Sequence, residues 1–267
     1  MRRFSQRQIP AMTQSTPYVL SGARNFRSFN GYRNADGEQI KPGKLFRSGA
    51  LQHSSPNALQ HIRDEIRLST VVDLRRPNER ELTPNPDVGA EQHQICVVKN
   101  DSMYLWQAFV ECRLDRGECE DFMLNYYRLL VREPAAEGYR QIFRLLLEDR
   151  GPLLFHCSAG KDRTGYLAAV IKMALGFDAD LIMRDFLLSN EVIRNSGHWS
   201  EMREREDIPD EVDWESIAPL LMVNEEYLKS SLDEMHKLSG GVDAYLSERL
   251  GLDGAARTEL RRILCTA

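Results

Sequence analysis

The residues with the clearest chemical potential lie in the segment HCSAGKDRTG at 156–165. Cys157 and Arg163 stand there with five residues between them, in a loop that follows an apolar run and precedes a helical pattern. A loop of this length can wrap around a tetrahedral anion, because successive backbone N–H groups and the positive end of the helix point inward. Arg163 adds a planar guanidinium that can make two hydrogen bonds to phosphoryl oxygens. The segment therefore predicts a phosphate-binding loop.

Cys157 has the position of a nucleophile beneath the bound phosphorus. The loop donors and a nearby guanidinium favour its thiolate, which is the reactive form of a cysteine. Gly160 allows a backbone conformation that residues with a Cβ reach only with strain. We expect Thr164 to hydrogen-bond the sulfur, His156 to orient the loop, and Lys161 to add positive charge at the mouth. The residues predicted to bind the phosphate are Ser158, Ala159, Gly160, Lys161, Asp162, Arg163 and Thr164.

Three other interpretations of this segment are weaker. A lone cysteine in a strand-to-helix turn is most often a small buried apolar residue, but here the whole string supplies an anion site. The phosphate loop of ATPases requires Gly-x-x-x-x-Gly-Lys-Ser/Thr, whereas Phe155 replaces its first glycine and Asp162 follows Lys161. Sulfur transferases of the rhodanese type typically carry a cysteine loop of different length, without this string.

A strand before the loop and a helix after it must position these groups, and the hydrophobic pattern predicts both. Residues 153–155 form a short apolar strand, and residues 166–175 form a buried helix that Gly176 ends. The same reasoning assigns strands to 69–74 and 93–98, and helices to 55–65, to parts of 103–149 and to much of 180–267. Strands that alternate with helices, followed by helices alone, predict an α/β fold with helical C-terminal additions.

The composition is that of a globular protein, with 267 residues of which 42% are hydrophobic and 28% charged. We predict one domain at 21–267 after a flexible arm at 1–20. The net charge of -5 argues against broad binding of nucleic acid or anionic membranes. The cysteines are odd in number and form no Cys-x-x-Cys pair, which argues against a disulfide framework and a structural zinc site. They are Cys96, Cys112, Cys119, Cys157 and Cys265.

No segment of the sequence predicts export or insertion into a membrane. The basic start lacks the apolar core of about 7–15 residues that signal peptides carry. The longest apolar stretch, at 166–177, is interrupted by Lys172 and is short of the roughly 18 residues that a membrane span requires. We expect a soluble cytoplasmic protein. Secretion without a signal and the oligomeric state stay open.

The segment at 156–165 matches the His-Cys-x5-Arg signature of cysteine-dependent tyrosine phosphatases, and the wider chain resembles their bacterial atypical branch. That branch includes secreted lipid and protein phosphatases of Listeria and Mycobacterium. The resemblance covers about residues 20–265. It rests on NFRSFNGY at 25–32, KLFRSGAL at 44–51, VVDLRRPNER at 71–80, LLFHCSAGKDRTG at 153–165, DFLLSN at 185–190 and YLSERLGL at 245–252. It implies a central, largely parallel sheet flanked by helices, and no metal or organic cofactor.

The resemblance also implies a protein-tyrosine phosphatase in which Cys157 attacks phosphorus and Arg163 clamps the phosphate. Lys161 and Asp162 match the GKDR variant that is associated with activity on phosphoinositides as well as phosphoproteins. Phosphoserine, phosphothreonine and phosphoinositides therefore stay open as further substrates. Helices after DFLLSN can cover the active site in this branch, so we expect a helical lid at about 195–230. The alternative function is a pseudophosphatase that binds phosphorylated partners without cleaving them.

Three aspartates compete for the role of general acid, which typically contributes about 10²- to 10⁴-fold to the rate. Asp73 is placed first, because the aspartate of the Asp-Leu-Arg motif looks like the acid of this branch. Its alternative role is a strand-end carboxylate bound to Arg75 or to a backbone amide. Asp162 in the loop is second and Asp101 in KNDSMY is third. Arg47 and Arg75 could form a positive rim around the pocket or internal salt bridges.

Overall fold

The computed structural model describes residues 19–99, 108, 111, 114–195 and 212–266. Several predictions concern residues outside these ranges. They are most of the arm at 1–20, Cys112, the candidate acid Asp101, and residues 196–211 of the expected lid.

Strands and helices alternate through the first part of the chain, and helices dominate the rest. The strands are β1 (Arg27–Ser28), β2 (Gln39–Ile40), β3 (Leu45–Ser48), β4 (Thr70–Asp73), β5 (Glu91–Gln94), β6 (Leu153–His156) and β7 (Cys265–Thr266). The helices are α1 (Pro56–His61), α2 (Pro77–Leu82), α4 (Arg116–Leu129), α5 (Ala135–Leu147), α6 (Arg163–Ala174), α7 (Ala179–Asn195), α9 (Trp214–Leu221), α10 (Glu225–Ser239), α11 (Val242–Leu250) and α12 (Gly254–Leu264). A 3-10 turn at Leu51–His53 precedes α1, and a π-helical turn at Ile62–Ile66 follows it.

Among the described residues, five strands form a central sheet in the order β1-β3-β6-β4-β5. The pair β1 and β3 is antiparallel, whereas the pairs β3 and β6, β6 and β4, and β4 and β5 are parallel. In register, His156 lies opposite both Ser48 and Asp73. The carboxyl ends of the three central strands therefore meet at one edge of the sheet, where ligands of parallel α/β sheets usually bind.

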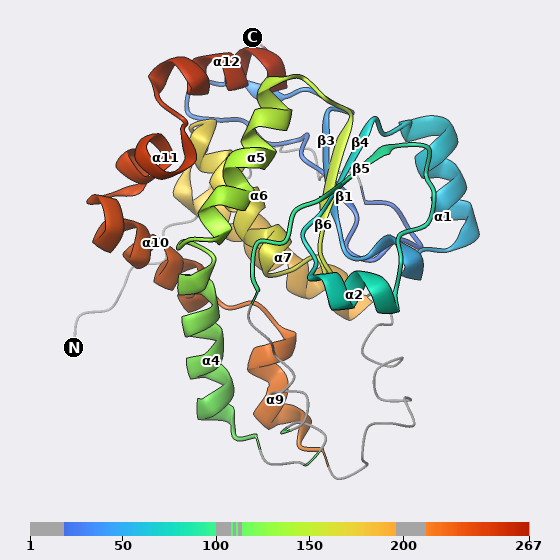
Figure 1. The fold of residues 1–267 in the computed structure, drawn as a ribbon, viewed down its shortest axis with the longest axis vertical. Coiled ribbons are helices and arrows are strands. Elements are labelled where there is room, and N and C mark those ends of the chain that lie inside the picture. The colour runs from blue at the N-terminus through green and yellow to red at the C-terminus, as the bar shows by residue number, and fades with distance from the viewer. Residues whose placement is uncertain (1–18, 100–107, 109–110, 112–113, 196–211, 267) are drawn as a thin grey trace, which may run out of the picture.

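Alternate side chains of the strands enter two different cores, as expected for a sheet buried on both faces. Val72 and Phe155 belong to the larger core, which includes the buried side chains of α5 and α6. Val71 and Leu154 belong to a second core with α1 on the opposite face. Figure 1 shows α1 on one side of the strands and α5, α6 and α7 on the other.

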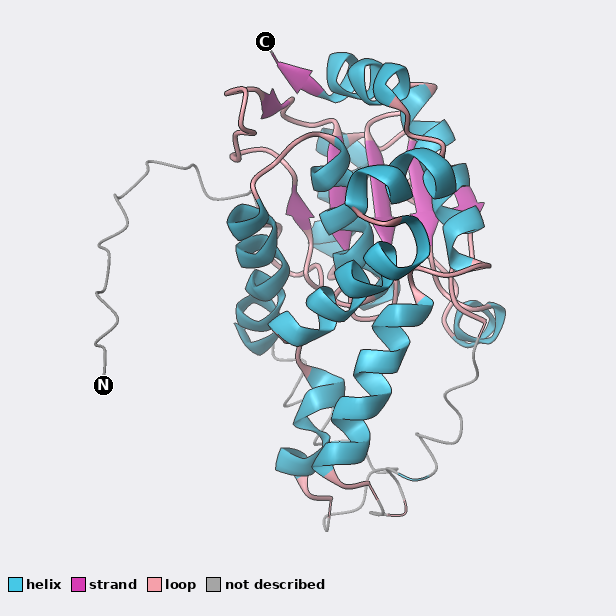
Figure 2. Cartoon of the chain, turned by 90° about the vertical axis from the view of Figure 1, so that its left-hand side faces the viewer, coloured by secondary structure: helices cyan, strands magenta, loops and turns pink. Residues whose placement is uncertain are grey.

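The C-terminal helices pack on the side of the sheet that carries the larger core. α11 and α12 pack on α5, α10 packs on α4, and β7 pairs with β2 in a small antiparallel ribbon. α4 and α9 lie side by side and extend beyond the end of the sheet (Figures 1 and 2). Their contact has its own small apolar cluster around Cys119, Val212 and Ile217.

The fold class is confirmed, because the sheet is largely parallel, is flanked by helices and is followed by further helices. The predicted strands at 69–74 and 153–155 are β4 and β6, and the helix predicted at 166–175 begins earlier, at Arg163. The strand predicted at 93–98 is wrong in its position. The residues that pair with β4 are Glu91–Gln94, which form β5. The apolar residues Ile95 and Val97, which suggested the strand, instead face α5 at Gly138.

Cys96, Cys119, Cys157 and Cys265 are free thiols. The described part of the chain contains no cluster of three or more metal-ligating side chains. None of its helices is long and apolar enough to cross a membrane.

Candidate active site

The predicted phosphate loop connects β6, which ends at His156, with α6, which begins at Arg163. Cys157 directly follows the strand and is 2% exposed. Gly160 has a φ of +72°, and a Cβ at this position would overlap the backbone of Ser48 and Gly49. The loop therefore passes so close to the end of β3 that only glycine fits there. The start of α6 also brings the positive end of a helix to the site.

Arg163 is held by a partner that the sequence did not reveal, the carboxylate of Glu79 on α2. Arg163 Nη1 donates to Glu79 Oε2 at 2.8 Å, and Nη2 donates to Oε1 at 2.9 Å. The hydroxyl of Ser158 also donates to Glu79 Oε1. Arg163 Nη2 also donates to Ser158 Oγ at 3.3 Å. A guanidinium has five N–H donors, so among the described residues these contacts leave the Nε–H for a phosphoryl oxygen. Glu79 thus fixes the direction of Arg163 across the mouth of the loop.

The charges of this pair stabilise each other. Burial raises the pKa of Glu79, but hydrogen bonds and charge from Arg163, with a contribution from Ser158, outweigh burial and hold this pKa well below its usual range. Burial lowers the pKa of Arg163, but Tyr126, Glu79 and Cys157 together raise it well above its usual range. Both groups therefore stay ionised over the whole physiological pH range.

Glu79 is itself positioned by the start of α2. The backbone N–H of Arg76 donates to Glu79 Oε2 at 2.9 Å, and Arg76 Nε donates to the same oxygen at 3.0 Å. This is the contact of a capping box, in which a Glu at the third helical position reaches back to the residue before the helix. The prolines in and after RRPNER at 75–80 predict a loop at the end of the strand, and this prediction is wrong, because α2 begins at Pro77. Pro77 at the first helical position and Glu79 two residues later are the sequence signal of this helix.

Lys161 and Asp162 pair with each other at the end of the loop. Lys161 Nζ lies 2.9 and 2.7 Å from the two carboxylate oxygens of Asp162. Tyr127 on α4, a second residue that the sequence did not reveal, donates its hydroxyl to Asp162 Oδ1 at 3.0 Å. The charge of Lys161 is thus offset locally by Asp162, and α4 contacts the loop through Tyr127.

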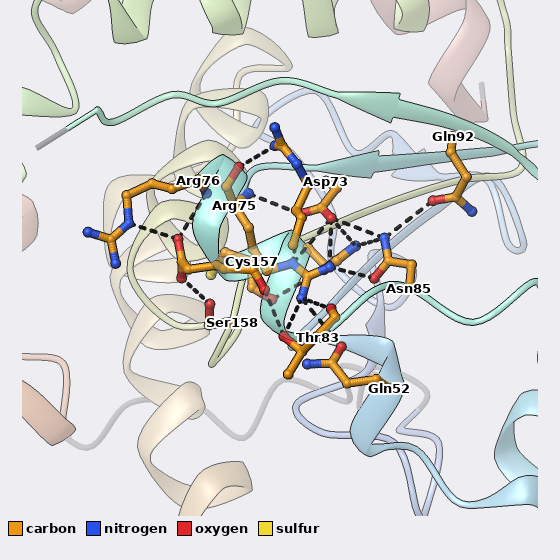
Figure 3. Close-up of polar contacts among 12 residues, drawn as sticks. Gln52, Asp73, Arg75, Arg76, Thr83, Asn85, Gln92, Cys157 and Ser158 are labelled. Atoms are coloured by element: carbon orange, nitrogen blue, oxygen red, sulfur yellow. Dashed lines mark hydrogen bonds and ion pairs between the residues drawn. The ribbon is translucent and has the colours of Figure 1, made fainter. Parts of the chain in front are cut away.

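Asp73 lies at the end of β4 in a closed network of hydrogen bonds (Figure 3). Its oxygens accept from Arg75 Nε at 3.0 Å, from Arg75 Nη2 at 2.8 Å and from Asn85 Nδ2 at 3.1 Å. Burial raises the pKa of Asp73, but the hydrogen bonds from Arg75 and the proximity of His156 lower it overall. This arrangement corresponds to the alternative role of Asp73, a strand-end carboxylate bound to Arg75.

His156 orients the loop as expected. It is fully buried, its Nδ1 lies 3.2 Å from the carbonyl oxygen of Cys157, and its Nε2 lies 3.0 Å from Asn85 Nδ2. Nδ1 therefore carries the proton and donates to the carbonyl, while Nε2 accepts from the amide. Burial lowers the pKa of His156, which keeps the imidazole neutral. The hydroxyl of Thr164 is also buried, but it has no hydrogen-bond partner among the described residues, so the expected bond to Cys157 is not formed.

The alternatives for Arg47 and Arg75 are resolved in favour of internal contacts. Both side chains are 1% exposed. Arg75 binds Asp73, Asn85 and the carbonyl oxygen of Thr83. Arg47 donates to the carbonyl oxygen of Gly160 behind the loop. Neither arginine forms a positive rim around the pocket.

The structure brings together Cys157, Arg163, Lys161, Asp162 and the remaining loop residues at the carboxyl edge of the sheet. Such a site can hold a phosphate group between a buried thiol, a guanidinium and backbone amides. Several known proteins are similar to this chain over most of its length. The chain is 31% identical, over 86% of its length and 83% of the other, to a Cupriavidus necator protein that carries the name of a tyrosine-protein phosphatase.

The chain is also 27% identical to the triple specificity protein phosphatase PtpB of Mycobacterium tuberculosis. That alignment covers 92% of this chain and 98% of PtpB. Solved structures with some likeness include the catalytic core of the PP-IP phosphatase SIW14 from S. cerevisiae, with 15% identity, a TM-score of 0.38, and coverage of 72% of this chain and 90% of that one. The P. aeruginosa protein TpbA bound to phosphotyrosine has 16% identity, a TM-score of 0.32, and coverage of 64% and 85%. The model of the tyrosine phosphatase family matches residues 18–266, and the chain therefore belongs to that family.

Proposed function

We propose that this chain is a cysteine-dependent phosphomonoester hydrolase that dephosphorylates phosphotyrosine in proteins. The observation that carries the proposal is the loop between β6 and α6, with the buried thiol of Cys157 at one end and Arg163 at the other. Glu79 holds Arg163 in one direction before any substrate binds. Such preorganised donors stabilise the charge of a phosphoryl transition state without reorganising during the reaction.

The reaction has two steps. In the first step the thiolate of Cys157 attacks phosphorus, and an S–P bond forms as the P–O bond to the substrate breaks. The leaving oxygen takes a proton from a carboxylic acid, while Arg163 and the loop amides hold the other phosphoryl oxygens. In the second step water attacks phosphorus and gives its proton to the same carboxylate. Phosphate then leaves, and the thiolate of Cys157 is restored.

Asp162 suits the role of general acid better than Asp73, which reverses the order that we gave them from the sequence. The side chain of Asp162 is 18% exposed at the loop, whereas that of Asp73 is 2% exposed. The contacts from Arg75 and Asn85 favour the ionised form of Asp73, which cannot donate a proton. Asp162 is also paired, with Lys161 and Tyr127, so what favours it over Asp73 is the greater exposure of its side chain at the loop. Asp73 then serves to anchor the end of β4.

The substrate range is proposed to extend beyond phosphotyrosine. The relative named a triple specificity protein phosphatase aligns over 98% of its own length, which supports a broad range for this chain. Rates on a phosphotyrosine peptide, a phosphoserine peptide and a phosphoinositide, measured side by side, test this part. Turnover of phosphotyrosine alone would restrict the proposal to that substrate.

The activity is tested with para-nitrophenyl phosphate, with and without a metal chelator and with vanadate as inhibitor. We expect turnover that survives chelation, stops with vanadate and is lost in Cys157→Ser. Cys96→Ser is the matched control, because Cys96 is another free thiol whose Sγ contacts the carbonyl oxygen of Val98 away from the loop. Vanadate binding without turnover by the wild-type protein would instead indicate the pseudophosphatase.

A further inference from the structure

The carbonyl groups of the phosphate loop are bound from behind by the segments around β1 and β3. The carbonyl oxygen of Ser158 accepts from the backbone N–H of Ala50 at 2.9 Å. The carbonyl oxygen of Gly160 accepts twice, from Asn25 Nδ2 at 2.7 Å and from Arg47 Nη2 at 2.8 Å. Carbonyls bound on this side cannot turn towards an anion, so the intervening amides are left to face the pocket.

Asn25 is held in an unfavourable state in order to make this contact. Its φ of +49° lies in the left-handed region, which asparagine adopts more often than most residues with a Cβ but which is still uncommon outside glycine. The side chain is fully buried, and its Oδ1 has no hydrogen-bond partner among the described residues. Backbone strain and a buried polar atom without a partner persist where the surroundings enforce them, and both gather at functional sites.

Arg47 is held by a buried charged cluster between the sheet and α7. Its Nη1 lies 3.4 Å from Asp185 Oδ2. Arg27 and Lys172 contact the same carboxylate, at 3.2 and 2.8 Å. All four side chains are at most 6% exposed, so three cations share one carboxylate away from water. A buried excess of positive charge is costly unless a negative group lies nearby.

The proposed mechanism places negative groups, a phosphate and the thiolate of Cys157, in the loop that Arg47 binds at Gly160, beside this cluster. Burial and Arg27 lower the pKa of Arg47, whereas Asp185 and Cys157 raise it. The charged or titratable side chains within electrostatic reach of Cys157 include Arg47, Arg163, Tyr126, Tyr127 and Tyr139.

We propose that Asn25 and Arg47 are positioning residues that clamp the carbonyl of Gly160, so that the loop amides face the phosphate, and that the charge of Arg47 also supports the thiolate. This inference rests on the proposed function of the same loop. It assigns a task to two segments far from the signature, NFRSFNGY at 25–32 and KLFRSGAL at 44–51. Neither side chain touches the substrate.

Asn25→Gly tests the clamp without adding strain, because glycine accepts a φ of +49° at no steric cost. We expect the variant to melt close to the wild type, to bind vanadate more weakly and to lose about 10- to 100-fold in kcat/KM, the size of effect that a displaced catalytic group produces. Asn34→Gly is the matched control. Asn34 is also buried, and its Nδ2 donates to the carbonyl oxygen of Leu175 at 3.0 Å, remote from the loop.

Two substitutions of Arg47 separate the clamp from the charge. Arg47→Lys keeps the charge but loses the planar fork, so vanadate binding should weaken while the rate of Cys157 alkylation by iodoacetamide at acidic pH is retained. Arg47→Met removes both, and we expect weaker vanadate binding and several-fold slower alkylation. A folded Asn25→Gly protein with the vanadate affinity and turnover of Asn34→Gly would overturn the clamp. Absence of turnover in the wild type would instead overturn the proposed function.

Discussion

Glu79→Gln removes the charge that holds Arg163 while keeping the size and shape of the side chain. In the wild type the carboxylate accepts from both terminal nitrogens of Arg163, at 2.8 and 2.9 Å, and is only 17% exposed. The glutamine amide can still accept one of these hydrogen bonds, but its NH2 group then faces a guanidinium N–H. We expect Arg163 to sample directions in which it no longer reaches the phosphate.

The size of the effect follows from the lost contact. A hydrogen bond to a charged group contributes about 1.5–3 kcal/mol. If one of the two bonds is lost, binding of the transition state should weaken by about 2 kcal/mol, which corresponds to about a 30-fold fall in kcat/KM. Vanadate occupies the same donors, so its affinity should fall by a similar factor.

Steady-state kinetics with para-nitrophenyl phosphate and competitive inhibition by vanadate measure both quantities. Glu81→Gln is the control, because Glu81 is exposed on the same helix and carries the same charge. If Glu79→Gln were as active as the wild type, Arg163 would not need Glu79 to reach the phosphate. If the variant were more active, Glu79 would compete with phosphate for Arg163. The positioning role of Glu79 would then be refuted.

Three further predictions concern the two aspartates and the buried lysine. Asp162→Asn should slow hydrolysis of alkyl phosphates more than that of para-nitrophenyl phosphate, which has a good leaving group, and an equal loss on both would argue against its role as the acid. Asp73→Ala should instead lower the free energy of unfolding by about 3 kcal/mol in urea titrations, because it leaves Arg75 buried without its ion-pair partner; an unchanged urea midpoint would contradict this. Burial lowers the pKa of Lys172 from 10.5 to about 8, although Asp185 opposes the shift. Between these two values the unfolded chain binds the proton that the folded protein has released, so the stability of the wild type relative to Lys172→Met should rise from pH 8 towards pH 10.5. If the stability difference stayed flat or fell over this pH range, the pKa of Lys172 would not be lowered in the folded protein.

The phosphate loop could be predicted because its chemistry is contiguous in sequence. Strand, cysteine, glycine, arginine and helix follow one another within 153–174, and each local preference agrees with the others. The partner of Arg163 could not be predicted in this way. Glu79 is 84 residues away, and it reaches the loop only because β4 lies beside β6 in the sheet.

The role of Asp73 shows a different limit. Its position at the end of a strand suits either a proton donor or an anchor, and only the side-chain directions of Arg75 and Asn85 favour one of them. The misplaced strand at 93–98 has a similar cause. Apolar residues such as Ile95 and Val97 are buried by a helix as well as by a sheet, and the sequence does not distinguish the two.

The central claim is that the thiol of Cys157 becomes covalently phosphorylated during turnover. It is tested most directly by mixing the protein with a substrate that has a good leaving group, quenching in acid within the first turnover, and analysing the peptides by mass spectrometry. We predict an added phosphoryl group on the peptide that contains Cys157, formed at the rate of leaving-group release and absent from Cys157→Ser. Turnover by the wild type without this adduct, or turnover by Cys157→Ser, would contradict the mechanism.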